Sequence, residues 1–434
     1  QVYVNDKTFF YLQCSVGLKD YDVINFESNV VGEDYNGLLS LLDNNLKLKG
    51  VQEIFLSDSQ NVAIFPKDQQ IIIKKNRDFV FDGKVRAGLF LFVGSNFSFT
   101  YEQFKLTLTD INTIKMRVQT DELDKYGNKV QRDLTSVIEN ATGELLLDEA
   151  NNKSSVKRIP KYPIFNSKKD SYVFYDYKSV FDGVYKRDNF YFQIYPYTLD
   201  SINTLTKKNL LFKGHFVSAG VFPPFDDVLS VQADYSLGFK RNTPADGFPA
   251  YGGKGNYKKE IYLSNRGLRG NGELAFVKAK AISDDFIFFP DSMNTTAKEF
   301  SIEKQTKGVE FASVQGKNIY VHWMPYKDEM LATNTTQPFD MYDKQATYTG
   351  TLKIEPKGLS GWGKLEFATA QLLSQDFNFK EHIVDADTSN FNLKTIDNSD
   401  FSFKTNNVKS HIDFNERKGE FQSNGEASFV EFPQ

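Results

Sequence analysis

Hydrophobic and polar residues alternate with a period of two over much of the chain. The alternation is clearest where aromatic or aliphatic residues occupy every second position, at 97–101, 104–108, 286–288, 377–379 and 401–403. Successive side chains of a β-strand point to opposite faces, so this pattern predicts strands with one apolar face. Gly, Asn and Asp residues separate these segments. We therefore expect an all-β fold, an elongated repeat of short strands that is either β-solenoid-like or built of stacked β-sheets, with little helix.

Three regions follow from the same pattern. Residues 1–60 form an N-terminal β segment, in which 36–46 predicts one short helix because four leucines there would share a helical face. Residues 61–250 are a first β-repeat region and residues 251–434 a second. The boundary is placed at 242–259, a glycine-containing stretch that interrupts the alternation and is expected to be a loop.

A segment of the second region is repeated at a fixed offset. Residues 267–276 (GLRGNGELAF) return as 358–367 (GLSGWGKLEF), and Phe288 returns as Phe379. The offset is the same in both cases, since 358 − 267 = 91 and 379 − 288 = 91. We assign the repeat to residues 263–304 and 354–395. Each copy of the repeat is expected to bury its apolar face against the next copy.

Composition narrows the possible functions. The chain has 434 residues, 40 of them Phe, and its 52 basic and 56 acidic residues are interspersed, giving a net charge of −4. Nucleic-acid binding needs a basic surplus on one face, so no nucleic-acid partner is expected. The single cysteine excludes an internal disulfide framework. No apolar run is long enough for a transmembrane helix, so none is predicted. Separately, we interpret the chain as a segment of a longer protein.

Motifs with catalytic chemistry are scarce. The four histidines include no pair at the i, i+4 spacing of a helical metal site, and we predict no catalytic, cofactor-binding or metal-binding residue. The glycines of 267–272 are expected to form turns, because no helix follows them to hold a phosphate. Oxygen-bearing side chains alternate over 385–390, but the glycine and glutamate of a calcium loop are missing, so this segment is also expected to be a turn.

Aromatic residues that interrupt the repeat are the remaining candidates. Trp362 stands where the first copy has Asn271, and Trp323 precedes Tyr326 in a second atypical stretch. Tyr195 and Tyr197 belong to a tyrosine-rich segment. We predict a contact surface for a partner chain or a sugar at Trp362, Trp323, Tyr326, Tyr195 and Tyr197. The alternative is that these rings pack locally on neighbouring loops.

Several segments resemble a known group of proteins. They are 57–66, 75–83, 234–239 and 267–272, and the likeness covers most of the chain from about residue 50 onward. In these segments the chain resembles a family of very long, largely uncharacterised exported β-repeat proteins of the cell envelope in Bacteroidota. The resemblance implies an envelope location, associated with the outer membrane or the cell surface, and no particular reaction.

These observations lead to one expected function and several alternatives. We expect a non-enzymatic scaffold or protein-binding segment of a large exported protein, whose partners are other envelope proteins of a larger complex and which needs no cofactor. One alternative is a cell-surface adhesin or glycan-binding module that uses its aromatic residues. Another is a β-solenoid polysaccharide lyase or hydrolase. The abundance of Phe also suggests an apolar groove that conducts lipid, which buried rings would argue against.

Overall fold

The computed structural model describes residues 8–16, 20–28, 36–57, 60–153, 156–395 and 400–432. The chain divides into two compact units. Unit 1 contains residues 1–217 and 225–239, and unit 2 contains residues 218–224 and 240–434. The division thus lies shortly before the boundary expected at 250. Within unit 1, β4 pairs with β7 and β5 with β6, so strands on both sides of residue 60 belong to the same unit.

The strands of unit 1, of which β17 and β19 cross the division, have the following bounds: β1 Thr8–Val16, β2 Asp20–Ser28, β3 Gly37–Leu39, β4 Leu46–Leu48, β5 Ile54–Ser57, β6 Val62–Pro66, β7 Ile71–Ile73, β8 Phe79–Ala87, β9 Phe90–Thr100, β10 Lys105–Leu123, β11 Lys129–Asp133, β12 Ile138–Leu146, β13 Ile164–Ser167, β14 Ser171–Phe174, β15 Phe190–Ile194, β16 Thr198–Leu199, β17 Leu211–Ser218, β18 Phe225–Val231 and β19 Leu237–Asn242. Two short 3₁₀ turns accompany them, η1 Lys67–Gln69 and η2 Phe181–Gly183.

The strands of unit 2 are more regular in length: β20 Phe248–Ala250, β21 Gly255–Ser264, β22 Gly267–Phe276, β23 Ala279–Phe288, β24 Met293–Ile302, β25 Val314–Met324, β26 Glu329–Asn334, β27 Phe339–Met341, β28 Ala346–Glu355, β29 Gly358–Phe367, β30 Ala370–Phe379, β31 Ile383–Lys394, β32 Phe401–Asn406, β33 Val408–Asp413, β34 Lys418–Ser423 and β35 Phe429–Glu431. The short turn η3 Pro325–Lys327 follows β25.

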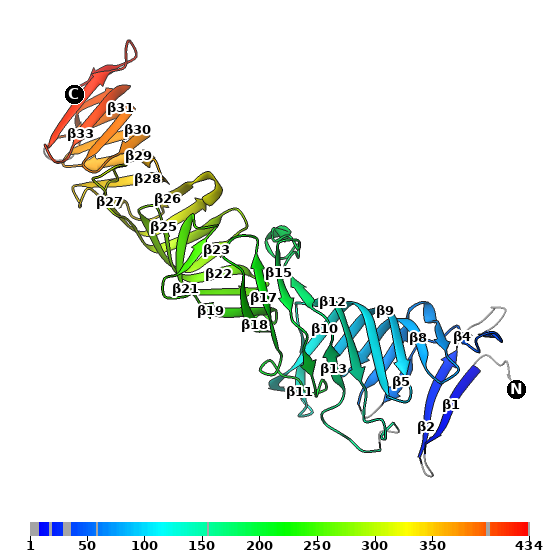
Figure 1. Ribbon diagram of the computed structural model, residues 1–434. Helices are drawn as coiled ribbons and strands as arrows, with labels where there is room; N and C mark the ends of the chain where they lie inside the picture. The colour runs from blue at the N-terminus through cyan, green and yellow to red at the C-terminus, as the bar shows by residue number, and fades with distance from the viewer. Residues whose placement is uncertain are drawn as a thin grey trace. The chain divides into compact units, whose positions relative to one another are not determined.

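The all-β prediction is confirmed, and strand pairing decides between its two arrangements. Every named strand pair with a defined register is antiparallel, for example β22 with β23 and β29 with β30. The coils of a parallel β-helix pair in parallel, so the described strands form antiparallel sheets instead, with β1 and β2 as a separate two-stranded sheet in unit 1. In unit 2 consecutive strands lie side by side, as β21 to β23 and β28 to β31 do in Figure 1.

The short helix predicted for 36–46 is wrong. The segment instead forms a hairpin, in which Gly37 of β3 faces Leu48 of β4, and Asn44 in the connecting turn has a positive φ of 57° that ends any helical run. β4 also pairs with β7, so the sheet supplies its backbone partners. The periodicity of the leucines was misleading because pairing with a distant strand overrides local helix propensity.

The 91-residue repeat is a structural repeat, and it begins before the segment that the sequence indicated. The bounds of β20 to β23 return as those of β27 to β30, since 339 − 248, 346 − 255, 358 − 267 and 370 − 279 all equal 91. The hairpin register is also repeated, because Ser264 faces Gly267 in one copy and Glu355 faces Gly358 in the other. Both copies shift register at the same place, at Gly270/Gly272 and Gly361/Gly363.

The repeated glycines lie inside strands rather than in the turns that the sequence predicted. A Cβ atom on Gly270 would collide with the hydroxyl of Tyr257, whose Oη donates a hydrogen bond of 2.9 Å to the carbonyl of Glu260. In the second copy a Cβ on Gly361 would lie 2.8 Å from the Oη of Tyr348. Each glycine therefore leaves room for a tyrosine of the neighbouring strand, and burial raises the pKa of both phenols.

The core of unit 2 forms because its sheet curls onto its own apolar face. Trp323 of β25 packs against Phe276 of β22, three strands away, with ring centroids 5.3 Å apart. The same indole fills the space above Gly255 of β21, where a Cβ would lie 2.7 Å from the Trp323 ring. Side chains from strands that are not neighbours therefore fill the space that the curled sheet encloses.

Unit 1 has its own aromatic core. Phe79 stacks on Phe99 at 4.8 Å, and Phe92 lies 4.8 Å from Phe165. All four rings are completely buried. The alternation predicted strands with one apolar face, and these Phe residues lie on faces that the core buries. An apolar lipid-conducting groove is not supported, because the rings that suggested it lie in closed packing.

Candidate binding surfaces

Trp323 does not belong to a contact surface. Its side chain is completely buried, and its ring makes an edge contact with Tyr251 at 5.1 Å. The prediction from sequence is wrong here because Gly255, distant in sequence, leaves room for the indole inside the sheet. The indole N–H finds no hydrogen-bond partner among the described residues.

The other predicted aromatic residues differ in exposure and are not brought together in one cluster by any described ring contact. Trp362 is 38% exposed and faces Thr351 in the β28–β29 hairpin. Tyr326 is 59% exposed and lies 6.0 Å from the ring of Tyr251. In unit 1, Tyr197 packs between Phe165 and Phe212, and burial raises the pKa of its phenol. Trp362 and Tyr326 are therefore separate exposed rings, whereas Tyr197 has a structural role.

Tyr195 takes part in a polar cluster that the sequence did not reveal. Its Oη donates to Asp226 Oδ1 at 3.0 Å, and His215 Nδ1 lies 2.7 Å from the same oxygen. His215 and Asp226 are directly opposite each other in the β17–β18 hairpin, and this pairing is the signal that could have identified them. Hydrogen bonds from His215 and Tyr195 hold the pKa of Asp226 below its ordinary value. The cluster is exposed, and its carboxylate is already engaged by two neighbours.

A second histidine–carboxylate pair lies in the second copy of the repeat. His411 Nδ1 lies 2.7 Å from Asp385 Oδ1, and Lys380 Nζ lies 2.9 Å from the other oxygen. Burial would raise the pKa of Asp385, but the bonds from Lys380 and His411 outweigh burial and hold it below its ordinary value. The turn predicted over 385–390 is wrong, because these residues lie within β31. Nowhere in the described parts of the chain are three or more His, Cys, Asp or Glu side chains placed to hold a metal ion.

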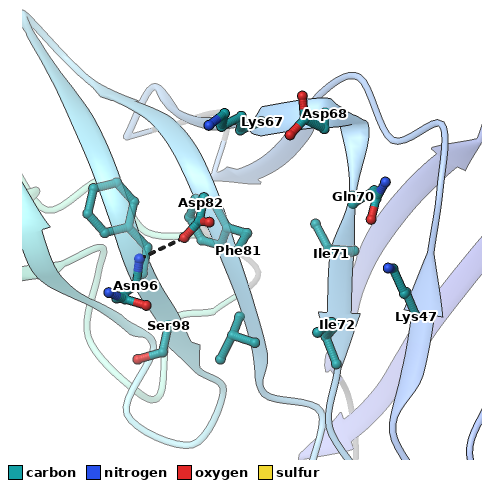
Figure 2. Close-up of a pocket in the computed structure, with 12 residues that line it drawn as sticks. Lys47, Lys67, Asp68, Gln70, Ile71, Ile72, Phe81, Asp82, Asn96 and Ser98 are labelled. Carbon is teal, nitrogen blue, oxygen red and sulfur yellow. Dashed lines mark hydrogen bonds between the residues drawn. The ribbon is translucent and has the colours of Figure 1, made fainter.

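A cavity of about 460 Å³ in unit 1 lies where the pairing around β8 is interrupted (Figure 2). Gly83 of β8 faces Pro66 of β6, and Val80 of β8 faces Ile72 of β7. The two residues between them on β8, Phe81 and Asp82, face neither strand. The turn η1, which joins β6 to β7, fills this interval and carries Lys67 and Asp68.

Both charge signs meet at this cavity. Lys47 and Lys67 lie at its margin with Asp68 and Asp82, and the backbone amide of Asn96 donates to Asp82 Oδ1 at 2.8 Å. Figure 2 shows Asp82 and Asn96 facing each other across β8 and β9. Two lysines and two carboxylates give the cavity no net charge, so net charge alone favours neither an anion nor a cation there.

Two groups of exposed apolar residues are a further feature that the sequence did not predict. One group lies at the turn between β3 and β4, where Leu41 is 84% and Leu42 99% exposed. A second lies on β34, on β35 and just after it, and includes Phe421, Val430 and Phe432. The exposure of these residues could not be predicted from the sequence, because the same apolar residues also occur in strands whose apolar face is buried by a neighbouring strand.

No protein-family model, no curated protein and no solved structure matches the chain. The resemblance to exported Bacteroidota proteins therefore remains a prediction. Across the part of the chain that the structure describes, no helix has the length and apolarity needed to cross a membrane.

Proposed function

We propose that this chain is a non-enzymatic structural scaffold or protein-binding segment of a large exported protein in a cell-envelope assembly. The observation that carries the proposal is the 91-residue repeat, in which four strands return with the same bounds and the same bulge in register. Repeats of this kind extend a sheet and present a regular surface to partners. The envelope location and the envelope partners come from the sequence resemblance alone.

The filled core supports a structural role in preference to the other functions considered. Trp323, Tyr257 and Tyr348 occupy the interior of unit 2 and are almost completely buried. The β-solenoid lyase or hydrolase required parallel coils, and the pairs of unit 2 with a defined register are antiparallel. A glycan-binding module stays an alternative because Trp362 presents an exposed ring on β29.

Fractionation of cells that produce the intact tagged protein tests the proposal. We expect the protein in the envelope fraction and, after extraction in gentle detergent, in a complex with other envelope proteins. Trp323→Ala is a matched variant that should lose partners bound through unit 2, because it empties the core, whereas Trp362→Asn keeps the core intact. Recovery of the wild-type protein as a free monomer outside the envelope would contradict the proposal.

A further inference from the structure

The last two strands of unit 2 repeat the arrangement of β26 and β27, but one side of them is open. β26 and β27 together act as one interrupted strand that pairs with β25 on one side and with β28 on the other. β34 and β35 form the corresponding interrupted strand, pairing with β33 and β32. In the described residues, no strand occupies the position next to them that β28 occupies next to β26 and β27.

The register identifies the equivalent residues. Ala332 of β26 faces Val321 of β25, and Phe421 of β34 faces Ser410 of β33. Val321 and Ser410 hold equivalent positions in their strands. Each precedes a histidine, and the two histidines, His322 and His411, contact Asn294 and Asp385, which are equivalent residues of the two copies. Phe421 therefore takes the place of Ala332.

The second half of the interrupted strand, β35, corresponds to β27. Val430 and Phe432 lie 91 residues after Phe339 and Met341, the apolar residues of β27. Phe339 faces Tyr348 of β28, and Met341 faces Ala346. The two apolar residues of β27 are thus each paired with a residue of the next strand, β28.

Exposure shows which contacts the terminal strands lack. Phe339 and Met341 are fully buried, whereas Val430 is 54% and Phe432 is 73% exposed. Ala332 is also fully buried, whereas the larger Phe421 that replaces it is 36% exposed. An open strand edge with apolar side chains beside it is a template for strand addition, in which main-chain hydrogen bonds provide affinity and side-chain positions provide specificity.

We propose that the edge formed by β34 and β35 binds one antiparallel strand with the pattern of β28, supplied by a further copy of the 91-residue repeat. The register of β28 specifies that strand: a tyrosine opposite Val430, as Tyr348 is opposite Phe339, and an apolar residue opposite Phe421, as Leu352 is opposite Ala332. The inference goes beyond the proposed function, because it concerns strand pairing and holds in any cellular location.

A labelled peptide with the sequence of residues 343–369, which contains β28 and β29, provides the probe. The full chain is titrated into the peptide, and binding is followed by fluorescence anisotropy. We expect saturable binding that a scrambled peptide of the same composition lacks, together with new hydrogen-exchange protection in β34 and β35. Val430→Glu should weaken binding at least tenfold. Val277→Glu is the matched control, because Val277 is 42% exposed in a turn distant from this edge in the strand order.

Three outcomes would overturn the proposal. The first is equal binding of the native and scrambled peptides, or binding of neither. The second is equal weakening by the two glutamate variants, with circular dichroism showing that both remain folded. The third is a concentration-dependent dimer of the chain alone that Val430→Glu abolishes, because a second copy of this chain would then occupy the edge.

Discussion

The two copies of the repeat, residues 248–323 and 339–414, keep the same central tyrosine but differ at many other positions, including one in the core, one beside a histidine and one on the exposed face. Tyr257 and Tyr348 occupy the same position and donate to equivalent carbonyl oxygens, at 2.9 and 3.0 Å. Outside this shared tyrosine, Trp323 is replaced by Phe414, Asn294 by Asp385 and Asn271 by Trp362. The fold thus depends on a few packing positions, and the side chains around them can change in size, charge and polarity without altering the strands.

The largest expected difference between the copies concerns their central rings. Phe414, 91 residues after Trp323, packs on Tyr342 and Phe367 as Trp323 packs on Tyr251 and Phe276. Trp323→Ala should lower the free energy of unfolding of unit 2 by about 4 kcal/mol, since it leaves a large cavity in a closed core. Phe414→Ala should cost less, about 3 kcal/mol, because the ring is smaller and 7% exposed.

Urea unfolding followed by circular dichroism measures both variants, with hydrogen exchange assigning the loss to unit 2. Trp362→Ala is the control for removing an aromatic ring, because that ring is exposed. An equal loss of stability for Trp323→Ala and Trp362→Ala would show that Trp323 does not fill the core.

The second prediction concerns the glycine that leaves room for each tyrosine. Gly270→Ala should destabilise unit 2 by about 2 kcal/mol, because its Cβ would overlap the Tyr257 hydroxyl. Adding Tyr257→Phe removes that hydroxyl and should restore part of the loss. In the second copy the Cβ of Gly361→Ala would also lie 2.6 Å from the carbonyl oxygen of Thr351, so Tyr348→Phe should restore less.

A double-mutant cycle in each copy measures this difference from the midpoints of urea unfolding. Each single Tyr→Phe variant is the control, because it loses the hydrogen bond without adding a Cβ. Equal coupling energies in the two copies would contradict the role given to Thr351, and zero coupling in the first copy would contradict the role given to Tyr257.

The third prediction uses the change from Asn294 to Asp385. His322 lies beside the neutral Asn294 and His411 beside Asp385, so only the second copy places a carboxylate against its histidine. The pKa of Asp385 is lower in the folded chain than its ordinary value. A lowered carboxyl pKa stabilises the fold above the unfolded pKa of about 3.9, and this contribution is lost as the pH falls through the folded pKa.

Asp385→Asn should therefore lower stability by up to about 1 kcal/mol at pH 7, and the difference from wild type should diminish below about pH 4. Urea unfolding between pH 3 and pH 7 provides the measurement. Asn294→Asp, the reciprocal change, should introduce a similar acid-dependent term into the first copy. A wild-type to Asp385→Asn difference that stays constant across this range would show that the carboxylate charge contributes nothing to folding.

The alternation predicted the β-strands and the fixed offset predicted the repeat, because both patterns can be read along a single sequence; the hairpin of β3 and β4 was the exception. It failed where a residue's environment comes from another strand. Gly270 looked like a turn residue because its partner Tyr257 lies on the preceding strand, and Trp323 looked exposed because the space it fills is created by Gly255. The polar cluster at Asp226 was missed for the same reason, since His215 approaches it only through hairpin register. Cross-strand contacts determine these sites, and a single sequence does not state them.

The smallest expected effect belongs to the exposed position where Asn271 becomes Trp362. Trp362→Asn gives the second copy the residue of the first, and because the ring is 38% exposed the stability should change by less than about 0.5 kcal/mol. A glycan array with the wild-type chain and this variant then distinguishes a scaffold from a glycan-binding module. For a scaffold, neither protein should bind. Sugar binding that Trp362→Asn abolishes and Asn271→Trp strengthens would instead favour the glycan-binding alternative, because aromatic rings on an otherwise unchanged sheet would then determine the affinity.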